Sequence, residues 1–359
     1  MNGTYTVRVG DKAASYEINL KRKLTIIRGD SGTGKSSMLN LFRRKQNDND
    51  PAVRLNSNVR CAVIEPQSWS DTIQKHTGDI LLFEEHSFLA SSNFARMMKY
   101  SDNYFVLITR LDYPTLPYSM DEIYSMERRG KRHMLVPEFK RKKESFTPSL
   151  VLTEDKRAGY QFFLNLVEGT SIKCDSVEGK GNFLTKLSNI SQVGARILLC
   201  VDAVAFGPHL NEIQKIIVAL ERIATIRWLA PECFEQLLLA SDMFMQHSDY
   251  SDKISHPEKY VQYVEADKEA VSWEKYYLHL LRELVENAPA SYAKDKSNLD
   301  VCFIENCCYR GNTCHLQSLG DKRAIVLGEN TRLFANVFVD TFQKSVVFVD
   351  GIDKMKSFD

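Results

Sequence analysis

Three glycines, a lysine and a serine between residues 29 and 36 have the spacing of a phosphate-binding loop. The stretch reads Gly29, Asp30, Ser31, Gly32, Thr33, Gly34, Lys35 and Ser36, with Ser37 directly after it. A polyphosphate that lies against a backbone needs several converging N–H groups, and glycine reaches the required conformations at least cost. A lysine can neutralise terminal phosphates, and a serine hydroxyl can ligate a bridging Mg²⁺. The spacing therefore predicts a site for nucleotide phosphates.

The flanking residues predict a strand before this loop and a helix after it. Residues 24–27 are apolar and β-branched, as a buried strand requires, and a helix is expected from about Lys35. Its apolar stripe consists of Met38, Leu39, Leu41 and Phe42. The order of strand, loop and helix, together with the pattern G-x-x-x-x-G-K-[ST], resembles the Walker A motif of P-loop nucleotide hydrolases. This resemblance implies ATP or GTP as ligand, together with Mg²⁺.

A second motif lies at residues 79–86, where four apolar residues end in Glu84 and Glu85. The run resembles a Walker B strand, with Glu84 in place of the usual aspartate. A carboxylate at such a strand end can hold Mg²⁺, and the next one can orient the attacking water. We assign Glu84, with Ser36, to the metal and Glu85 to the water, and the reverse assignment stays open. Lys35, Glu84 and Glu85 form the predicted catalytic set.

Residues 104–110 predict a further buried strand, reached through a helix expected at residues 88–99. Its polar end, Thr109 and Arg110, supplies candidates for sensing the terminal phosphate. A predicted hairpin over residues 4–20 is similar to the start of ABC-type ATPases. However, the LSGGQ signature is missing and the distance from Lys35 to the acidic strand is too short for their helical insertion. The core therefore resembles RecA-like ATPases.

The second half of the chain alternates strands with helices, which predicts a parallel sheet. Strands expected at residues 149–155 and 196–202 bring Glu154 and Asp202 to the carboxyl edge of that sheet, where ligands bind. The pair resembles the Toprim domain, in which a Glu and an Asp-x-Asp surround Mg²⁺ to cut or join phosphodiesters. The resemblance implies a metal site at Glu154 and Asp202. Val204 stands in place of the second aspartate, and Glu232 or Glu235 can supply a replacement carboxylate.

A P-loop domain followed by a Toprim-like domain resembles the OLD-family proteins that act in phage and mobile-element defence. The resemblance implies nucleotide hydrolysis coupled to a nucleic-acid transaction, with the second domain a nuclease or its regulator. A nucleotide-dependent switch or scaffold with an inactive second domain remains an alternative. A small-molecule kinase is disfavoured because no arginine-rich lid follows the loop.

The sequence thus predicts an α/β protein with two domains and a C-terminal extension. Residues 1–147 are expected to form the P-loop domain on a parallel sheet, residues 148–290 the Toprim-like domain, and residues 291–359 a helical and cysteine-containing extension. The extension contains a possible zinc site, whose ligands are Cys302, Cys307 (or Cys308), Cys314 and His315. Its spacing lacks the usual pair of C-x2-C knuckles, which favours reduced structural thiols over zinc.

Composition limits the class of protein and its partners. Of the 359 residues, 43% are hydrophobic and 26% charged, which is typical of globular proteins. No apolar run is long enough to span a bilayer and no signal-peptide core opens the chain, so we expect a cytoplasmic protein without a membrane partner. Eight lysines and arginines lie between Arg128 and Lys143. They can bind DNA or RNA, or form a solvated hairpin. A homo-oligomer or a protein partner is also expected.

Overall fold

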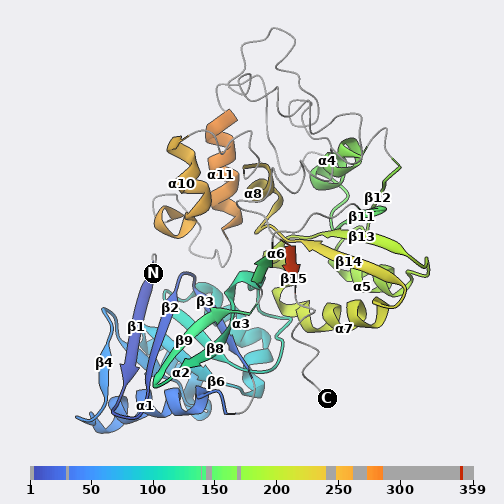
Figure 1. The fold of residues 1–359 in the computed structure, drawn as a ribbon. Coiled ribbons are helices and arrows are strands. Elements are labelled where there is room, and N and C mark those ends of the chain that lie inside the picture. The colour runs from blue at the N-terminus through green and yellow to red at the C-terminus, as the bar shows by residue number, and fades with distance from the viewer. Residues whose placement is uncertain are drawn as a thin grey trace. The chain divides into compact units, whose positions relative to one another are not determined.

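The computed structural model describes residues 4–29, 32–138, 140–142, 148–167, 171–239, 248–261, 273–285 and 348–350. The chain is an α/β protein that forms two compact units (Figure 1). Unit 1 comprises Met1–Phe139, Phe206–Leu210 and Glu258–Trp273, and unit 2 comprises Lys140–Ala205, Asn211–Pro257 and Glu274–Asp359.

Unit 1 is built on one nine-stranded sheet with the spatial order β4-β1-β2-β9-β8-β3-β7-β6-β5. The strands are β1 (Tyr5–Gly10), β2 (Ser15–Leu20), β3 (Leu24–Arg28), β4 (Arg54–Asn56), β5 (Cys61–Val63), β6 (Ile80–Glu84), β7 (Tyr104–Ile108), β8 (Ile123–Arg129) and β9 (Arg132–Pro137). The hairpin predicted for residues 4–20 is confirmed as β1 and β2, and the strand predicted before the glycine-rich loop is confirmed as β3.

The parallel sheet predicted for this unit is correct for only part of it. Strands β8, β3, β7, β6 and β5 run parallel to one another. The rest of the sheet is mixed, because β1 pairs antiparallel with β2 and with β4, and β8 pairs antiparallel with β9. Short turns join β1 to β2 and β8 to β9, and a short turn can join only antiparallel neighbours.

Helices cover the parallel part of the sheet on both faces. They are α1 (Lys35–Asp48), α2 (Trp69–Lys75) and α3 (Ser92–Tyr100), with the short turns η1 (Pro66–Ser68), η2 (Ser87–Ala90) and η3 (Met120–Glu122). The apolar stripe of α1 shares one core with Ile80 and Leu82 of β6. The alternate residue Phe83 faces the other way and stacks on Phe105, with ring centroids 5.7 Å apart. The central strands β3, β7 and β6 are mostly apolar because both faces of the sheet are covered there.

One predicted helix is interrupted. The sequence pattern predicts a single helix over residues 88–99, but the chain forms the turn η2, breaks at Ser91, and then begins α3. The Ser91 hydroxyl accepts a hydrogen bond from the Phe94 N–H at 3.1 Å. Serine is a strong N-cap because its side chain satisfies an N–H group that lacks a partner within the helix. The cap therefore fixes where α3 starts.

Two stretches from later in the chain pack within unit 1. The first contains η4 (Gly207–His209), where a Cβ atom on Gly207 would lie 2.1 Å from the Tyr118 carbonyl oxygen. The second runs from Glu258, the middle residue of η5 (Pro257–Lys259), to Trp273, whose ring lies 3.6 Å from the Arg22 guanidinium. Arg22 forms a buried ion pair with Glu122 at 2.7 Å. Close packing at Gly207 holds the first stretch in unit 1, and the cation–π contact between Arg22 and Trp273 holds the second.

Unit 2 is built on a second sheet with the order β10-β15-β14-β13-β11-β12. Its strands are β10 (Lys140–Lys142), β11 (Leu150–Thr153), β12 (Lys173–Ser176), β13 (Ala195–Cys200), β14 (Ala224–Leu229) and β15 (Phe348–Asp350). Strands β12, β11, β13 and β14 are parallel, which confirms the prediction for this half of the chain. Strand β15 pairs antiparallel with β14 and with β10.

The helices of unit 2 are α4 (Ala158–Leu166), α5 (Lys180–Ser188), α6 (Ala203–Phe206), α7 (Leu210–Leu220), α8 (Phe234–Leu239), α10 (Ser248–Ser255) and α11 (Glu274–Val285). Within this unit, α5 and α7 lie on one face of the sheet and α4 on the other (Figure 1). From β11 the chain goes to β12 on one side, and then returns to β13 on the other side of β11. Such a reversal of strand order opens a crevice beyond the carboxyl ends of the strands, where ligands bind. Apart from β15, the predicted extension of residues 291–359 lies outside the described residues.

Candidate functional site

The glycine-rich loop leaves the end of β3 and enters α1, which begins at Lys35 as predicted. Gly29, Gly32 and Gly34 have φ angles of 131°, 85° and 97°. A side chain at Gly34 would be strained by this φ and would also lie 3.0 Å from the His133 ring. Glycine is therefore required there for both conformation and space. Asp30 and Ser31 lie outside the described residues.

The amine of Lys35 folds back over this loop. It donates hydrogen bonds to the Gly29 carbonyl and to the Thr33 hydroxyl, the latter at 2.9 Å. Ser36 and Ser37, in the first turn of α1, are exposed. The ammonium group and two hydroxyls thus stand at the N-terminal end of a helix, where backbone N–H groups and the helix dipole favour anions.

The loop and two strand ends line one hollow of about 270 Å³. Glu84 and Glu85 come from the end of β6, and Thr109 and Arg110 follow β7. Because β3, β7 and β6 are parallel neighbours, their carboxyl ends meet at one edge of the sheet. The structure thus brings together the described residues of the predicted phosphate loop, both predicted acids and both candidate sensors.

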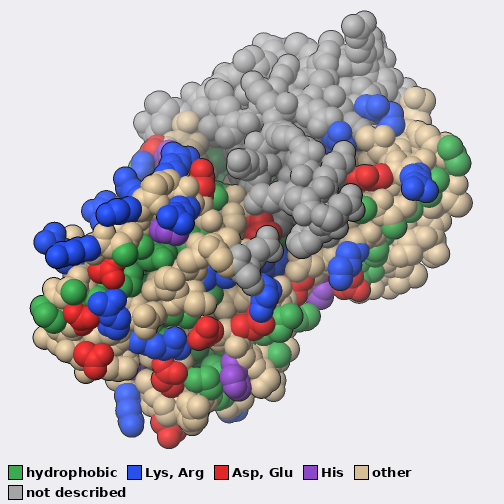
Figure 2. Space-filling model, turned by 60° about the horizontal axis from the view of Figure 1, so that its bottom comes forward, with side chains coloured by type: hydrophobic (Ala, Val, Ile, Leu, Met, Phe, Trp, Pro, Cys, Tyr) green, Lys and Arg blue, Asp and Glu red, His purple; other side chains and the backbone are tan. Residues whose placement is uncertain are grey.

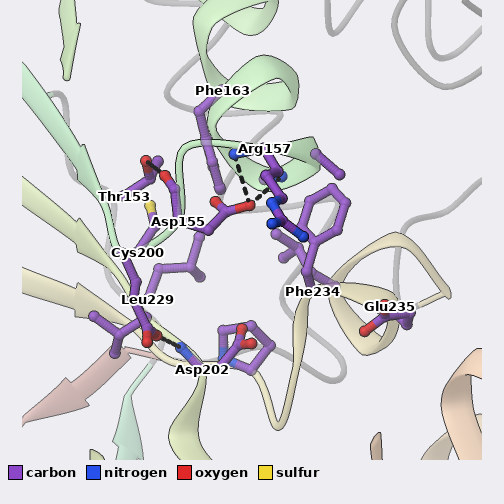
Figure 3. A pocket seen from close by; sticks show the side chains of 15 residues that line it. Thr153, Asp155, Arg157, Phe163, Cys200, Asp202, Leu229, Phe234 and Glu235 are labelled. Carbon is purple, nitrogen blue, oxygen red and sulfur yellow. Dashed lines mark hydrogen bonds between the residues drawn. The ribbon is translucent and has the colours of Figure 1, made fainter. Parts of the chain in front are cut away.

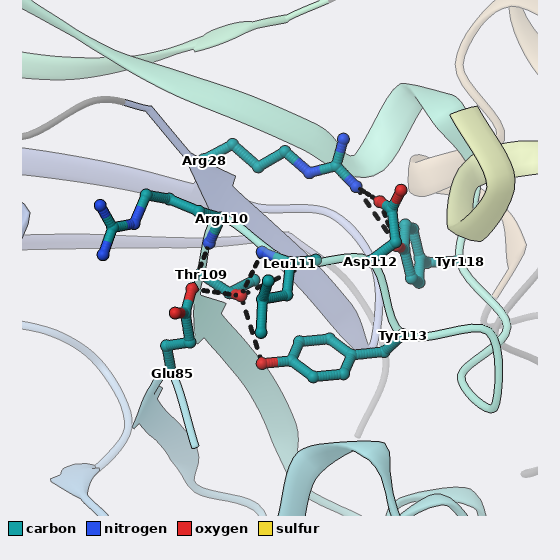
Figure 4. Close-up of polar contacts among 8 residues, drawn as sticks. All are labelled: Arg28, Glu85, Thr109, Arg110, Leu111, Asp112, Tyr113 and Tyr118. Carbon is teal, nitrogen blue, oxygen red and sulfur yellow. Dashed lines mark hydrogen bonds and ion pairs between the residues drawn. The ribbon is translucent and has the colours of Figure 1, made fainter. Parts of the chain in front are cut away.

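Glu85 is held in place from the neighbouring strand. Its carboxylate accepts hydrogen bonds from the Thr109 hydroxyl at 3.0 Å and from the Arg110 N–H at 2.6 Å (Figure 4). Thr109 is only 2% exposed, and its hydroxyl also accepts from the Leu111 N–H at 2.9 Å. Two donors that converge on one carboxylate oxygen fix the orientation of Glu85 at the rim of the hollow.

The hydrogen-bond network continues into residues that the sequence did not single out. The Tyr113 hydroxyl lies 3.2 Å from that of Thr109, and burial raises the pKa of the Tyr113 phenol. In the same loop, Asp112 forms an ion pair with Arg28, and the Tyr118 hydroxyl lies 3.4 Å from an Arg28 nitrogen (Figure 4). The spacing of these residues in the sequence does not predict the contacts, because they depend on how the loop after β7 folds back over β3.

Glu84 lines the same hollow, but its side chain is exposed and pairs with an arginine. Its carboxylate is 3.2 Å from an Arg43 guanidinium nitrogen on α1, and the Glu84 side chain is 49% exposed. Arg43 also pairs with Glu65 at 2.8 Å. Exposed pairs of this kind contribute little to stability and exchange readily with solvent. Glu84 can therefore turn from Arg43 toward a ligand in the hollow.

Unit 2 has a hollow of its own, of about 390 Å³, at the point where its strand order reverses. Glu154 and Asp202, which follow β11 and β13, both line it. Figure 3 shows Asp202 at this hollow. The two residues are adjacent, because the Asp202 N–H donates to the Glu154 carboxylate at 3.4 Å and the Glu154 N–H donates to the Cys200 carbonyl at 3.0 Å. The predicted meeting of these two acids is thus present in the structure.

Asp155, the residue after Glu154, has a structural role. Its carboxylate accepts N–H hydrogen bonds from Arg157, Gly159 and Tyr160 at 3.2, 3.1 and 3.0 Å (Figure 3). These bonds cap the start of α4, and burial nevertheless raises the pKa of Asp155. A Cβ atom on Gly159 would lie 2.6 Å from this carboxylate, so glycine is needed for the close approach.

The structure gives limited support to metal sites in unit 2. Within the described ranges, no three His, Cys, Asp or Glu side chains are grouped so that they could hold a metal ion. Val204 cannot ligate, and Glu235 lines the hollow but is only 2% exposed. Glu232 is likewise buried. The possible zinc ligands Cys302, Cys307, Cys314 and His315 lie outside the described residues.

The basic run lies partly on the exposed turn between β8 and β9. Four of its side chains have local partners: Arg128 bonds the Gly130 carbonyl, Arg129 pairs with Glu127, Lys131 bonds the Lys12 carbonyl and Arg132 pairs with Glu17. Figure 2 shows Lys and Arg side chains interspersed with Asp and Glu over the visible face of unit 1. The side chains of residues 140–143 are not among the described ones. These partners are those expected of a solvated hairpin, and they leave the charges exposed.

Comparisons with protein-family models, with curated proteins and with solved structures gave no match. No helix in the described part of the chain is both long and apolar enough to cross a membrane.

Proposed function

We propose that unit 1 binds and hydrolyses ATP or GTP with Mg²⁺, as a RecA-like P-loop nucleotide hydrolase. The observation that carries this proposal is the convergence of Lys35, at the end of the glycine-rich loop, and the braced carboxylate of Glu85 on one hollow. A glycine-rich turn without a function would have no need of an oriented carboxylate opposite its lysine. Phosphoryl transfer needs both positive charge on the phosphates and a positioned water.

The residues around the hollow suit a nucleotide with its metal ion. Backbone N–H groups of the loop and the Lys35 ammonium would bind the phosphates, and the Ser36 hydroxyl with Glu84 would hold Mg²⁺. Mg²⁺ held by these two residues would supply positive charge to offset the charge that develops on the phosphates. Glu85 would accept a hydrogen bond from the attacking water. Thr109 and the Arg110 N–H keep the Glu85 carboxylate in the required orientation.

For the whole chain we propose that this hydrolysis drives or regulates a nucleic-acid transaction through a Toprim-like unit 2. The adjacent acids Glu154 and Asp202, at the strand reversal, support this assignment. The resemblance to OLD-family proteins suggests cleavage, or its regulation, in defence against mobile DNA. The exposed cations of the β8–β9 turn are the candidate contacts to DNA or RNA.

One observation favours a second candidate function, a nucleotide-dependent switch. In the described part of unit 2, the Glu154 carboxylate contacts the Asp202 backbone, but no three potential ligands are grouped so that they could hold a metal ion. Metal-dependent cleavage usually needs more ligands than two carboxylates supply. In this alternative, nucleotide binding changes protein contacts and unit 2 performs no chemistry.

Phosphate release by the full-length protein tests the proposal for unit 1. We expect Mg²⁺-dependent turnover of ATP or GTP that Lys35→Ala abolishes. The matched control is Lys45→Ala, which removes the same charge from the last turn of the same helix. Lack of turnover in the wild type, or equal turnover in Lys35→Ala, would refute hydrolysis at this loop.

Nicking of supercoiled plasmid with Mg²⁺ or Mn²⁺ separates the two functions of unit 2. A nuclease would lose activity in Glu154→Ala and Asp202→Ala but keep it in Asp175→Ala, an acid on β12 paired with Lys186. Absence of cleavage, combined with nucleotide-dependent formation of a complex, would favour the switch.

A further inference from the structure

Arg43 on α1 connects two acids that follow neighbouring strands. Its Nε–H donates to a Glu65 carboxylate oxygen at 2.8 Å, and one of its terminal N–H groups donates to a Glu84 carboxylate oxygen at 3.2 Å. Glu84 ends β6, and Glu65 lies two residues beyond β5, the parallel neighbour of β6. The carboxyl ends of parallel neighbours meet at one edge of a sheet, so one guanidinium can reach both acids. We call Arg43, Glu65 and Glu84 the Arg43 bridge.

The two acids of the Arg43 bridge differ in their position at the nucleotide hollow. Glu84 lines this hollow, whereas Glu65 and Arg43 do not. Both acids are half-exposed, and the Arg43 side chain is more shielded from solvent than either of them. Glu84 is therefore the acid that can exchange Arg43 for a metal ion in the hollow, and Glu65 is the acid that can stay with Arg43.

The helix that carries Arg43 is fixed to the strand that precedes Glu65. Gln46 lies three residues further along α1 and thus close to Arg43 on the helix surface. Its side chain accepts a hydrogen bond from the Val63 N–H at 2.8 Å and donates to the Val63 carbonyl at 3.4 Å. Val63 is the last residue of β5. Because α1 is held to the end of β5, the contact of Arg43 with Glu65 can persist when Glu84 turns away.

We propose that Arg43 and Mg²⁺ compete for the Glu84 carboxylate, and that Glu65 retains Arg43 when Glu84 turns to the metal. This inference rests on the proposed function of unit 1, in which Glu84 helps to hold Mg²⁺. A carboxylate that faces a guanidinium is a poorer ligand for a second cation, because the two positive charges repel each other. The charge-assisted hydrogen bond to Glu65 makes the release of Glu84 less costly, because Arg43 keeps one partner. Arg43 and Glu65 are thus positioning residues that act through Glu84.

The gain in ATP affinity that Mg²⁺ provides measures this competition. For each variant the gain is the Kd for ATP in EDTA divided by the Kd for Mg²⁺–ATP, so an effect on phosphate binding alone cancels. Arg43→Met removes the competing cation and should raise this ratio about threefold, the size expected for one partly exposed ion pair. Glu65→Gln leaves Arg43 with Glu84 as its charged partner and should lower the ratio about threefold.

Two controls show whether the effect passes through Glu84. In a Glu84→Gln background, neither Arg43→Met nor Glu65→Gln should change the ratio. Arg44, the next residue of α1, is about as shielded as Arg43 but pairs with two aspartates outside the hollow, so Arg44→Met should keep the wild-type ratio. An unchanged ratio in Arg43→Met or in Glu65→Gln, or an equal change in Arg44→Met, would overturn the inference.

Two measurements without nucleotide keep this inference separate from the proposed function. In NMR spectra, the Nε–H of Arg43, assigned by its loss in Arg43→Met, should exchange slowly with water in the wild type and in Glu84→Gln, and faster in Glu65→Gln. Mn²⁺ alone, followed by electron paramagnetic resonance, should bind more tightly to Arg43→Met than to the wild type, and Glu84→Gln should abolish this gain.

The outcomes of these measurements distinguish the two claims. If both results hold but the wild type binds neither ATP nor GTP, the proposed function alone is refuted. If slow exchange is lost in Glu84→Gln and kept in Glu65→Gln, or if Arg43→Met brings no gain in Mn²⁺ affinity, the inference is overturned whether or not nucleotide binds.

Discussion

The hydroxyl of Thr109 lies 3.0 Å from the carboxylate of Glu85, and this contact joins the ends of two neighbouring parallel strands. Residues at such strand ends can be distant in sequence and still act together, because the sheet fixes the distance between them. The contact gives a defined orientation to Glu85, which lines the same hollow as the glycine-rich loop. It is the basis of the first two predictions.

Replacing Glu85 should stop hydrolysis and spare binding. Glu85→Gln keeps the size of the side chain and an oxygen that can accept from Thr109, but removes the negative charge that orients water. We expect kcat for ATP to fall about 100-fold or more, with Kd within about threefold of the wild type. Measurement of both constants checks this, with Glu127→Gln on the exposed end of β8 as control. A parallel loss of affinity would show that Glu85 serves binding instead.

Thr109→Val should reduce turnover through Glu85. The substitution preserves shape but removes the donor to Glu85 and the contact with Tyr113. Partners that orient a catalytic group typically contribute roughly 10- to 100-fold to activity, so a decrease in kcat of this size is expected. Thr109→Ser retains the hydroxyl and should retain most of the activity. Equal kcat values for the Val and Ser variants would contradict the bracing role.

The neighbouring acids Glu154 and Asp155 should differ in their effect on stability. Asp155→Ala removes the cap of α4 and should lower the free energy of unfolding by about 1 kcal/mol. Glu154→Ala leaves that cap intact and should cost less. Denaturant titration of both variants, with circular dichroism as readout, makes the comparison. A larger loss for Glu154→Ala would mean that the capping role is wrong.

Gly207→Ala should destabilise unit 1. Its Cβ atom would lie 2.1 Å from the carbonyl oxygen of Tyr118 and 2.7 Å from a Tyr118 ring carbon. Overpacking of this kind costs about 1–3 kcal/mol, because a buried backbone atom cannot move aside cheaply. Gly181→Ala on α5 has no neighbour within 4 Å and should be neutral or slightly stabilising. Thermal unfolding of the two variants tests the difference, and equal melting temperatures would contradict the packing at Gly207.

Acid should destabilise the protein partly through His133. The pKa of His133 in the folded protein is lowered by burial and by Arg128, so the unfolded chain binds this proton more readily. The contribution to stability is therefore present above the ordinary histidine pKa of about 6.5, and is lost as the pH falls through the folded pKa. His133→Gln should show a smaller decrease in unfolding free energy between pH 7.5 and 5.5. An identical decrease would indicate that other groups account for it.

The parts of the fold that the sequence predicts are those with strong local patterns. The apolar run of β3, the glycines after it and the stripe of α1 each occupy a short segment, so strand, loop and helix follow from neighbouring residues. The same holds for β6 and β7, whose apolar runs end at Glu84 and Thr109. Apart from the β1–β2 hairpin, the antiparallel pairs of the unit 1 sheet are not predicted, because hydrophobic periodicity identifies strands but not their neighbours.

The contacts within the candidate sites could not be predicted for the same reason, since they depend on which strands are neighbours. The sequence identifies Glu85 and Thr109 as candidates but not their contact, which depends on the order of β6 and β7 in the sheet. Tyr16 and His133 carry no motif, and only the pairing of β2 with β9 brings them beneath the loop. Likewise, no sequence pattern distinguishes Asp155 from Glu154. The capping role of Asp155 depends on where the chain after β11 places the N–H groups of Arg157, Gly159 and Tyr160.

Isothermal titration of the full-length protein with Mg²⁺–ATP and Mg²⁺–GTP, repeated with Lys35→Ala, is the most direct test of the central claim. We expect one nucleotide site per chain in the wild type and loss of that site in Lys35→Ala, with binding by Lys45→Ala unchanged. Absence of binding in the wild type, or binding of equal affinity in Lys35→Ala, would contradict it.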